Sequence, residues 1–248
     1  MPTTDLSTDL FLGGRLRLAQ PARGHRAGTD AVLLQACVPA DATGAAIDVG
    51  AGVGAAGLAA LLRAPALAMT LAEIDPATAA LARTNAAANG LAAVVVEVDV
   101  LEAAARRAAG LKDGAAALVL TNPPFYAPGA ARASPDPARA RAHMGEIGPW
   151  MKAALALLAP GGLFLMIHRP DALPEILRGA EGRLGGLRIK PVSPRAGVAA
   201  VRILVAGRKG SRAPLALSPE LVLHGADGAF TPAAAALHAG AAGVDMGV

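Results

Sequence analysis

A glycine-rich turn between an apolar strand and a helix limits the possible fold of this chain more than any other feature. Residues 48–54 read Asp-Val-Gly-Ala-Gly-Val-Gly, follow the apolar stretch 45–47 and precede a helix rich in Ala and Leu that extends through Leu62. Glycines let the backbone turn sharply and approach a ligand closely, and the helix N-terminus beyond them favours negative or polar ligand groups. The turn therefore predicts the first strand-turn-helix unit of a ligand-binding sheet.

Acidic residues mark the ends of the next two predicted strands. Residues 69–73 read as a second strand that ends in Glu73, and Pro76 suits the first position of a helix capped by Asp75. This leaves Glu73 to accept hydrogen bonds from the two hydroxyls of a ribose. A third strand, residues 94–98, ends at Asp99, which we expect beside the adenine of a bound nucleoside cofactor, because ligands bind beyond the carboxyl ends of parallel strands.

The tetrapeptide Asn122-Pro123-Pro124-Phe125 closes a further apolar run, residues 115–121. Prolines lack the amide hydrogen that a sheet needs, so the strand ends there and the turn is rigid. We expect the Asn122 amide and the proline carbonyls to accept hydrogens from a planar amino group on a base or an amide. Phe125 and Tyr126 stand together in a chain with 2% aromatic residues, and one of the two is suited to stack on a flipped base.

A dinucleotide-binding oxidoreductase is the rival interpretation of the glycine turn, because Gly50-x-Gly52-x-x-Ala55 loosely fits the fingerprint of such enzymes. On that interpretation Asp48 would lie near a pyrophosphate that it repels. A sulfonium cofactor with a free amino group would be attracted by Asp48 instead. The Asn-Pro-Pro-Phe turn has no role in hydride transfer either, so we favour S-adenosylmethionine over NAD.

In this order the motifs resemble the class I adenine-N6 methyltransferases. Segments 11–16, 20–21 and 24–34 (Gly-His-Arg-Ala-Gly-Thr-Asp-Ala-Val-Leu-Leu) are similar to the start of the bacterial tRNA(Val) adenine-N6 methyltransferase group. The resemblance spans most of the chain and implies methyl transfer from S-adenosylmethionine to the exocyclic N6 of an adenine in RNA, with tRNA as the expected substrate. One departure is Ala117, where such proteins usually carry an Asp. We expect this loss to affect hydrogen bonding at the strand edge more than chemistry.

The expected site has a catalytic part and a cofactor part. The catalytic residues are those of the turn: Asn122, Pro123, Pro124 and Phe125. The expected cofactor-binding residues come from four strand ends: Asp48, Gly50, Gly52, Gly54, Glu73, Asp99 and Asn122.

Strands that alternate with helical stretches predict a single α/β domain of the Rossmann-like class I type, with a mostly parallel seven-stranded sheet and helices on both faces. Residues 187–192 and 198–206 should form a closing antiparallel hairpin. Residues 1–39 should form an extension on the substrate side, with a short hairpin around Gly13 and a helix capped by Thr29 or Asp30. Residues 40–248 are then the methyltransferase domain.

Positive charge concentrates after the catalytic turn. Residues 125–212 carry fourteen basic and five acidic side chains, whereas residues 40–124 carry five and eight. A basic surface beside the target pocket is typical of a nucleic-acid substrate. The alternative is a coding bias toward arginine, because only four of the 23 basic residues are lysines. The RNA contacts that we expect are Arg15, Arg17, Arg132, Arg139, Arg141 and Tyr126.

Several classes of protein are disfavoured. The single cysteine, Cys37, excludes an internal disulfide, and five histidines without ligand spacing predict no metal site. We expect a cytoplasmic protein with no membrane-spanning segment or export signal. The oligomeric state stays open.

Two other functions stay open. The first is a glutamine methyltransferase acting on a protein, since the same turn can hold a side-chain amide. That function would predict a separate N-terminal recognition domain, for which residues 1–39 are too few. The second is a non-catalytic RNA-binding relic of the fold, against which intact Asp48, Glu73 and Asn122 argue.

Overall fold

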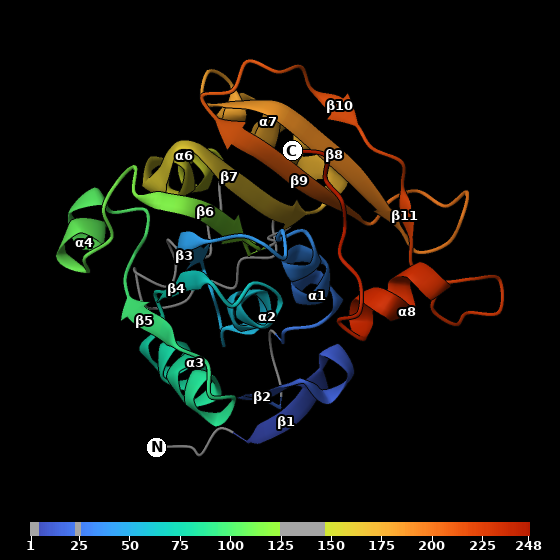
Figure 1. The fold of residues 1–248 in the computed structure, drawn as a ribbon, viewed down its shortest axis with the longest axis horizontal. Coiled ribbons are helices and arrows are strands. Elements are labelled where there is room, and N and C mark those ends of the chain that lie inside the picture. Colours follow the sequence, from blue (N-terminus) through green and yellow to red (C-terminus); the bar gives the residue numbers. More distant parts are fainter. Residues whose placement is uncertain (1–4, 23–25, 125–146) are drawn as a thin grey trace, which may run out of the picture.

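The computed structural model describes residues 5–22, 26–124 and 147–248 (Figure 1). Within these ranges a central sheet is covered by helices on both faces, and an N-terminal hairpin forms a separate two-stranded sheet. Seven strands of the central sheet correspond to those predicted: β3 (Gly44–Val49), β4 (Leu67–Glu73), β5 (Ala93–Glu97), β6 (Ala116–Thr121), β7 (Leu158–His168), β8 (Leu184–Ser193) and β9 (Arg202–Lys209).

The strand order explains where a ligand can bind. The seven strands lie in the order β8-β9-β7-β6-β3-β4-β5. Strands β3 to β7 are mutually parallel, whereas β9 is antiparallel to both β7 and β8, which confirms the closing hairpin. The order reverses between β3 and β6, so the crevice outside their carboxyl ends is the expected ligand position.

Two very short strands extend the predicted sheet. The two-residue strands β10 (Ala216–Leu217) and β11 (Leu221–Val222) both pair in parallel with β8, which gives nine strands in the described part of the chain. Two residues carry no readable alternation of polar and apolar positions, so the sequence pattern did not predict them.

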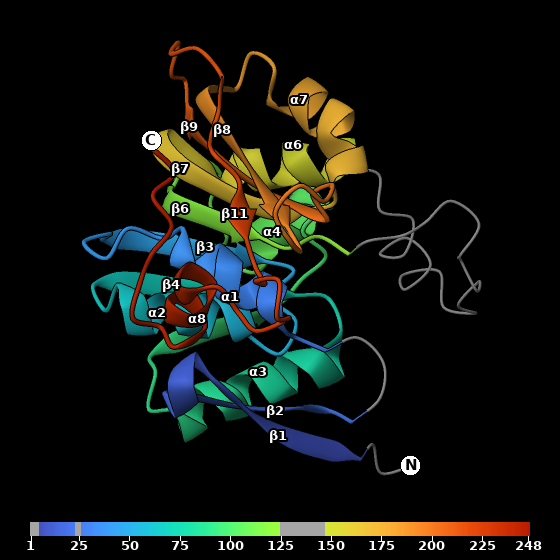
Figure 2. The ribbon, with the colours of Figure 1, turned by 90° about the vertical axis from the view of Figure 1, so that its right-hand side faces the viewer.

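Each face of the sheet has its own apolar core. One core includes helices α1 (Thr29–Ala36), α2 (Ala55–Arg63) and α3 (Pro76–Ala88), together with α8 (Pro232–His238) near the C-terminus. The other core includes α6 (Ile147–Leu157) and α7 (Leu173–Ala180), with α4 (Ala103–Ala108) packed beside it. Figures 1 and 2 show the two groups of helices on opposite sides of the strands.

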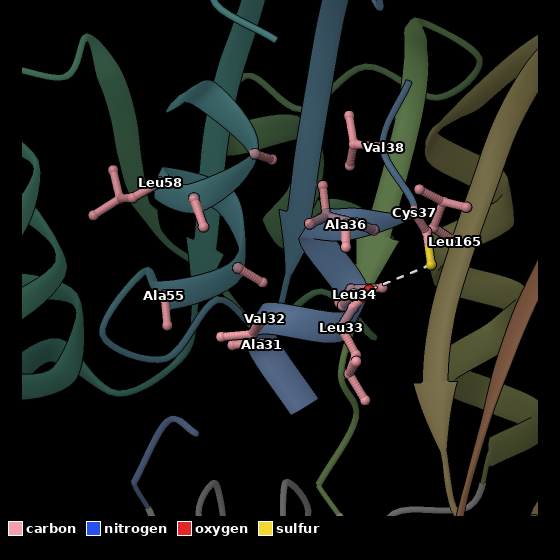
Figure 3. Packing of buried hydrophobic residues seen from close by; sticks show 14 of the residues in the cluster. Ala31, Val32, Leu33, Leu34, Ala36, Cys37, Val38, Ala55, Leu58 and Leu165 are labelled. Carbon is pink, nitrogen blue, oxygen red and sulfur yellow. Dashed lines mark hydrogen bonds between the residues drawn. The ribbon is translucent and has the colours of Figure 1, made fainter. Parts of the chain in front are cut away.

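Helix α1 packs its apolar side chains between α2 and the sheet. Figure 3 shows Leu33, Leu34 and Cys37 in this core, with the Cys37 Sγ donating to the Leu33 carbonyl. Burial raises the pKa of the Cys37 thiol to about 12, so the thiol stays protonated. The predicted caps of α1 are wrong. Gly28 occupies the cap position without a side-chain bond, and the Asp30 carboxylate accepts from Arg202 Nε at 2.8 Å instead.

The N-terminal hairpin joins β1 (Leu6–Phe11) and β2 (Leu16–Pro21) through a 3-10 turn, Leu12–Gly14. The turn contains the predicted Gly13, whose φ of 66° favours glycine. Leu16 and Leu18 of β2 are fully buried in the same core as α2. The hairpin therefore packs on the central α/β fold through its apolar face.

Within the described ranges, no helix is long and apolar enough to cross a membrane. The same residues contain no group of three or more His, Cys, Asp and Glu side chains that could hold a metal ion.

Candidate active site

The glycine turn is tied to the end of the neighbouring strand. The Gly50 and Ala51 amides donate to the Ala72 carbonyl of β4 at 2.9 and 3.0 Å. Gly50, Gly52 and Gly54 have φ values of 73°, 57° and 88°. Side chains rarely tolerate this conformation, so the three glycines permit a turn that non-glycine residues would strain.

Glu73 connects the glycine turn to the turn after β4. Its Oε2 accepts from the Gly52 amide at 2.8 Å, and its Oε1 accepts from the Ile74 and Asp75 amides at 2.8 and 2.9 Å. A carboxylate has about four acceptor positions, so only about one is left for a ribose hydroxyl in this arrangement. To accept hydrogen bonds from both ribose hydroxyls, Glu73 would have to give up at least one of its hydrogen bonds from the backbone amides.

Asp75 confirms the predicted cap of α3. Its Oδ1 accepts from the Thr78 amide at 2.8 Å, and Pro76 occupies the first turn. Since the cap holds Asp75 beside α3, Glu73 is the acid that faces the glycine turn.

Asp48 lies beneath the turn and points toward α2. Only 2% of the residue is exposed, and its Oδ2 accepts from the Gly57 amide at 2.8 Å. A side chain at position 57 would place its Cβ 2.3 Å from Leu71 Cδ2 and 3.0 Å from Asp48 Oδ2, so glycine lets α2 approach the sheet this closely. Burial, with a smaller contribution from the charge of Glu73, raises the pKa of Asp48 to about 7, although the Gly57 amide opposes the shift.

A buried threonine and a tryptophan join the ends of β3 and β6. Thr121 Oγ1 donates to the Val49 carbonyl at 2.8 Å and accepts from Trp150 Nε1 at 2.9 Å. The Trp150 ring covers Gly50, where a Cβ would lie 2.9 Å from two ring carbons. Neither residue was among those predicted from the sequence. Their signals are the only tryptophan of the chain and a hydroxyl directly before Asn122.

Asn122 presents an unsatisfied acceptor at the end of β6. Its Oδ1 is buried and has no hydrogen-bond partner within the described residues. The following Pro123 is buried and Pro124 is half-buried. A buried polar atom without a partner costs about 1–3 kcal/mol, and such atoms in native proteins usually need an explanation such as a ligand or a bound water. Asn122 is thus prepared to accept a hydrogen from a bound molecule.

Asp99 completes the edge two residues beyond β5. Its side chain is half-buried, and its Oδ1 accepts from the Leu101 amide at 2.9 Å. Because β3, β4, β5 and β6 are parallel neighbours, their carboxyl ends share one edge of the sheet. The fold therefore brings the glycine turn, Glu73, Asp99 and Asn122 to the same side.

The expected RNA contacts are not gathered in the same way. Arg15 lies in the hairpin turn before β2 and donates to the Gly240 carbonyl at 3.2 Å. Figure 2 shows this turn on the side of the molecule away from the end of β6. Arg17 is exposed on β2. The remaining predicted residues lie outside the described part of the chain: Phe125, Tyr126, Arg132, Arg139 and Arg141.

Many basic side chains after residue 147 have structural partners. Arg202 pairs with Asp30, and Arg169 pairs with Asp171. Five others donate to backbone carbonyls: Arg183, Arg188, Lys190, Arg208 and Lys209. Part of the positive charge in residues 125–212 therefore stabilises the C-terminal half of the fold.

Known proteins share both the sequence and the fold. A tRNA1(Val) (adenine(37)-N6)-methyltransferase of Porphyromonas gingivalis is 31% identical over 238 aligned positions, and the match covers 92% of this chain and 92% of that one. The crystal structure of a predicted O-methyltransferase, protein Atu636 from Agrobacterium tumefaciens, has a TM-score of 0.76 and 35% identity, and the match covers 88% of this chain and 100% of that one.

A more distant structure shows the same fold. M. jannaschii TYW2 in complex with AdoMet has a TM-score of 0.59 at 9% identity, over 84% of this chain and 88% of that one. The sequence model of the methyltransferase small domain matches residues 26–178. On this match and on the identity to full-length relatives, the chain belongs to the methyltransferase small domain family.

Proposed function

We propose that this protein transfers a methyl group from S-adenosylmethionine to the exocyclic N6 of an adenine in RNA, with tRNA as the substrate. The carrying observation is the buried Asn122 Oδ1 at the end of β6, an acceptor with no partner among the residues that the structure describes. Family membership and the tRNA adenine-N6 activity named for the Porphyromonas gingivalis relative support the same function. A tRNA substrate also favours a cytoplasmic location.

The turn suits the chemistry of an amino group. The lone pair of an adenine amino group is delocalised into the ring, which makes the nitrogen a poor nucleophile. In our proposal the Asn122 Oδ1 and the Pro123 carbonyl accept its two hydrogens and favour a pyramidal nitrogen with its lone pair toward the methyl. S-adenosylmethionine, when bound, would supply an activated methyl on a positively charged sulfur, which would keep the electron pair of the broken S–C bond. One of the two amino hydrogens would then leave the methylated nitrogen as a proton to solvent. The protein contributes alignment and fixed dipoles, and Phe125 is proposed to hold the plane of the base.

Methylation of a hydroxyl fits the turn less well. The Agrobacterium tumefaciens protein is described as a predicted O-methyltransferase, and a hydroxyl substrate needs a base to remove its proton. Asn122 is an amide and has no basicity. Transfer to a glutamine side chain would use the same acceptors, but the named activity of the relative favours RNA.

The cofactor end favours a cation over a pyrophosphate. Glu73 accepts from the Gly52 amide of the glycine turn, and the Asp48 carboxyl group lies beneath the turn, where it accepts from the Gly57 amide of α2. We propose that Glu73 and Asp48, whose pKa of about 7 lets it ionise near neutral pH, attract the sulfonium and amino groups of S-adenosylmethionine. Glu73 accepts from the ribose in this proposal, and Asp99 lies beside the adenine. The backbone of Gly50, Gly52 and Gly54 then permits close approach.

The purified protein should bind S-adenosylmethionine and not NAD. Glu73→Ala should weaken cofactor affinity by about 1.5–3 kcal/mol, because a charged acceptor is lost. Glu97→Ala is a matched control, since Glu97 is the register partner of Glu73 on β5 but pairs with the exposed Arg83. Trp150 covers Gly50, so its fluorescence offers a titration signal beside calorimetry. Binding of NAD without S-adenosylmethionine would overturn the cofactor assignment.

The arginines after the catalytic turn should contact phosphates. Changing Arg132, Arg139 or Arg141 to Ala should weaken RNA binding across sequences and lower the salt slope by up to about one unit for each contact. Arg188→Ala removes the same charge from a side chain that donates to the Pro214 carbonyl, so it serves as the control. If the salt slopes match those of the control, coding bias and not RNA binding explains these arginines.

Mass spectrometry of tRNA nucleosides tests the function directly. N6-methyladenosine should disappear from a deletion strain and return when the gene is restored. An unchanged nucleoside profile would contradict the proposed substrate.

A further inference from the structure

Asn85 of α3 and Asn89, which caps the C-terminus of α3, hold the outer edge of the N-terminal hairpin. Asn85 accepts from the Ala19 amide at 2.8 Å and donates to the Ala19 carbonyl at 3.0 Å. Asn89 binds Arg17 in the same way, at 2.9 and 2.7 Å. Four helical residues rise about 6 Å and two strand residues about 6.6 Å, so the spacings of helix and strand match. The two side-chain amides therefore replace a neighbouring strand along β2.

Asn85 makes one further contact that Asn89 does not. Its Nδ2 donates to the Val53 carbonyl of the glycine turn at 3.0 Å. Only 1% of Asn85 is exposed, and both of its amide hydrogens have acceptors. The second amide hydrogen of Asn89 goes to the Asn85 carbonyl in the last turn of α3. A single buried side chain thus joins the hairpin to the turn proposed to bind the cofactor.

The hairpin in turn reaches the segment that precedes α1. Gln20 of β2 is 1% exposed, and its Oε1 accepts from the Ala27 amide at 2.9 Å. Its Nε2 donates to Asp9 of β1 at 2.6 Å. The glycine turn, Asn85, β2 and the start of α1 are consequently linked by consecutive hydrogen bonds through side chains that water hardly reaches.

We propose that Asn85 is a positioning residue that couples the cofactor turn to the N-terminal hairpin. The Val53 carbonyl holds the Asn85 amide, and that amide holds Ala19 on the edge of β2, so a cofactor that steadies the turn also steadies the hairpin. The hairpin is then held more firmly for the RNA substrate while the cofactor is bound. This inference rests on the proposed cofactor and deepens the proposed function, because it assigns an order to the binding of cofactor and RNA.

Asn85→Asp and Asn89→Asp form a matched pair of variants. Each keeps the oxygen that accepts from β2 and loses two donations, but only Asn85→Asp loses the bond to Val53. Hydrogen exchange of the Arg17 and Ala19 amides should slow when S-adenosylmethionine binds to the wild type and to Asn89→Asp. In Asn85→Asp this cofactor-dependent protection should be lost, and the Kd for S-adenosylmethionine should rise about tenfold, the equivalent of one hydrogen bond.

Ala19→Pro provides a second test from the hairpin side if Asn85→Asp folds poorly. Proline removes the Ala19 amide hydrogen that the Asn85 oxygen accepts, and it leaves the hydrogen bond between Asn85 and the Val53 carbonyl in place. Position 19 lies on an edge of the strand, where proline is tolerated. Cofactor affinity should stay within about twofold of the wild type, and the protection of Arg17 should fall.

The outcomes separate the two proposals. A wild-type protein that does not bind S-adenosylmethionine overturns the proposed function and this inference with it. If the wild type binds the cofactor but Asn85→Asp matches Asn89→Asp in Kd and in protection, only the coupling is overturned. Unchanged protection of Arg17 in Ala19→Pro overturns it as well.

Discussion

Asn122→Ala should lower the rate of methyl transfer by about a hundredfold or more, which is comparable to the loss of one preorganised polar contact in other enzymes. In our mechanism the Asn122 oxygen acts mainly when the nitrogen develops positive charge against the methyl. An interaction that is stronger in the transition state than in the ground state affects turnover more than substrate binding. Affinity for S-adenosylmethionine should therefore change little.

The stability of this variant gives an independent signature. Because the Asn122 Oδ1 is buried without a partner among the described residues, its removal should not destabilise the fold. Asn122→Asp keeps the acceptor and should lose less activity than Asn122→Ala. Single-turnover methylation at saturating cofactor, with varied RNA, separates rate from binding, and chemical denaturation measures the stability. Near-normal turnover in a folded Asn122→Ala protein would contradict the mechanism.

Phe125→Ala should act on a different step. If Phe125 stacks on the flipped base, its loss should weaken RNA capture by about 1–3 kcal/mol. In the same single-turnover series, the RNA concentration that gives half of the maximal rate should rise. The maximal rate should change less. An unchanged RNA dependence would remove Phe125 from the site.

Asp48→Asn should stabilise the protein at neutral pH by up to about 4 kcal/mol. Burial raises the pKa of Asp48 from 3.8 to about 7, so the folded chain holds this proton where the unfolded chain has released it. Folding then takes up a proton between about pH 4 and pH 7, and stability is lost as the pH rises through this window. Asn stays neutral and still offers an oxygen to the Gly57 amide, so the variant avoids this loss.

Denaturant unfolding of both proteins between about pH 4 and pH 8 measures this effect. The other titrating groups are shared, so the difference in unfolding free energy isolates Asp48. That difference should grow with pH and level off above about pH 7. A difference that does not change with pH would contradict the assigned pKa. The variant should also lose affinity for S-adenosylmethionine, since a buried charge that destabilises the fold is expected where binding needs it.

The sequence by itself determined the local units of this protein. Strand ends, the glycine turn and the Asp75 cap depend on residues a few positions apart, so periodicity, glycine and proline predicted them. The order of the motifs also indicated the methyltransferase family, which the relatives confirm.

Only the tertiary structure decided which partners these residues have. Asp30 was predicted as a cap, but Arg202, 172 positions away, binds it. Trp150 covers Gly50 at the point where the strand order reverses. Asn85 joins β2 to the glycine turn, although it is 66 positions from Ala19 and 32 positions from Val53. Contacts of this kind depend on how helices dock on the sheet, and packing distances between distant segments leave no periodic signal in the sequence.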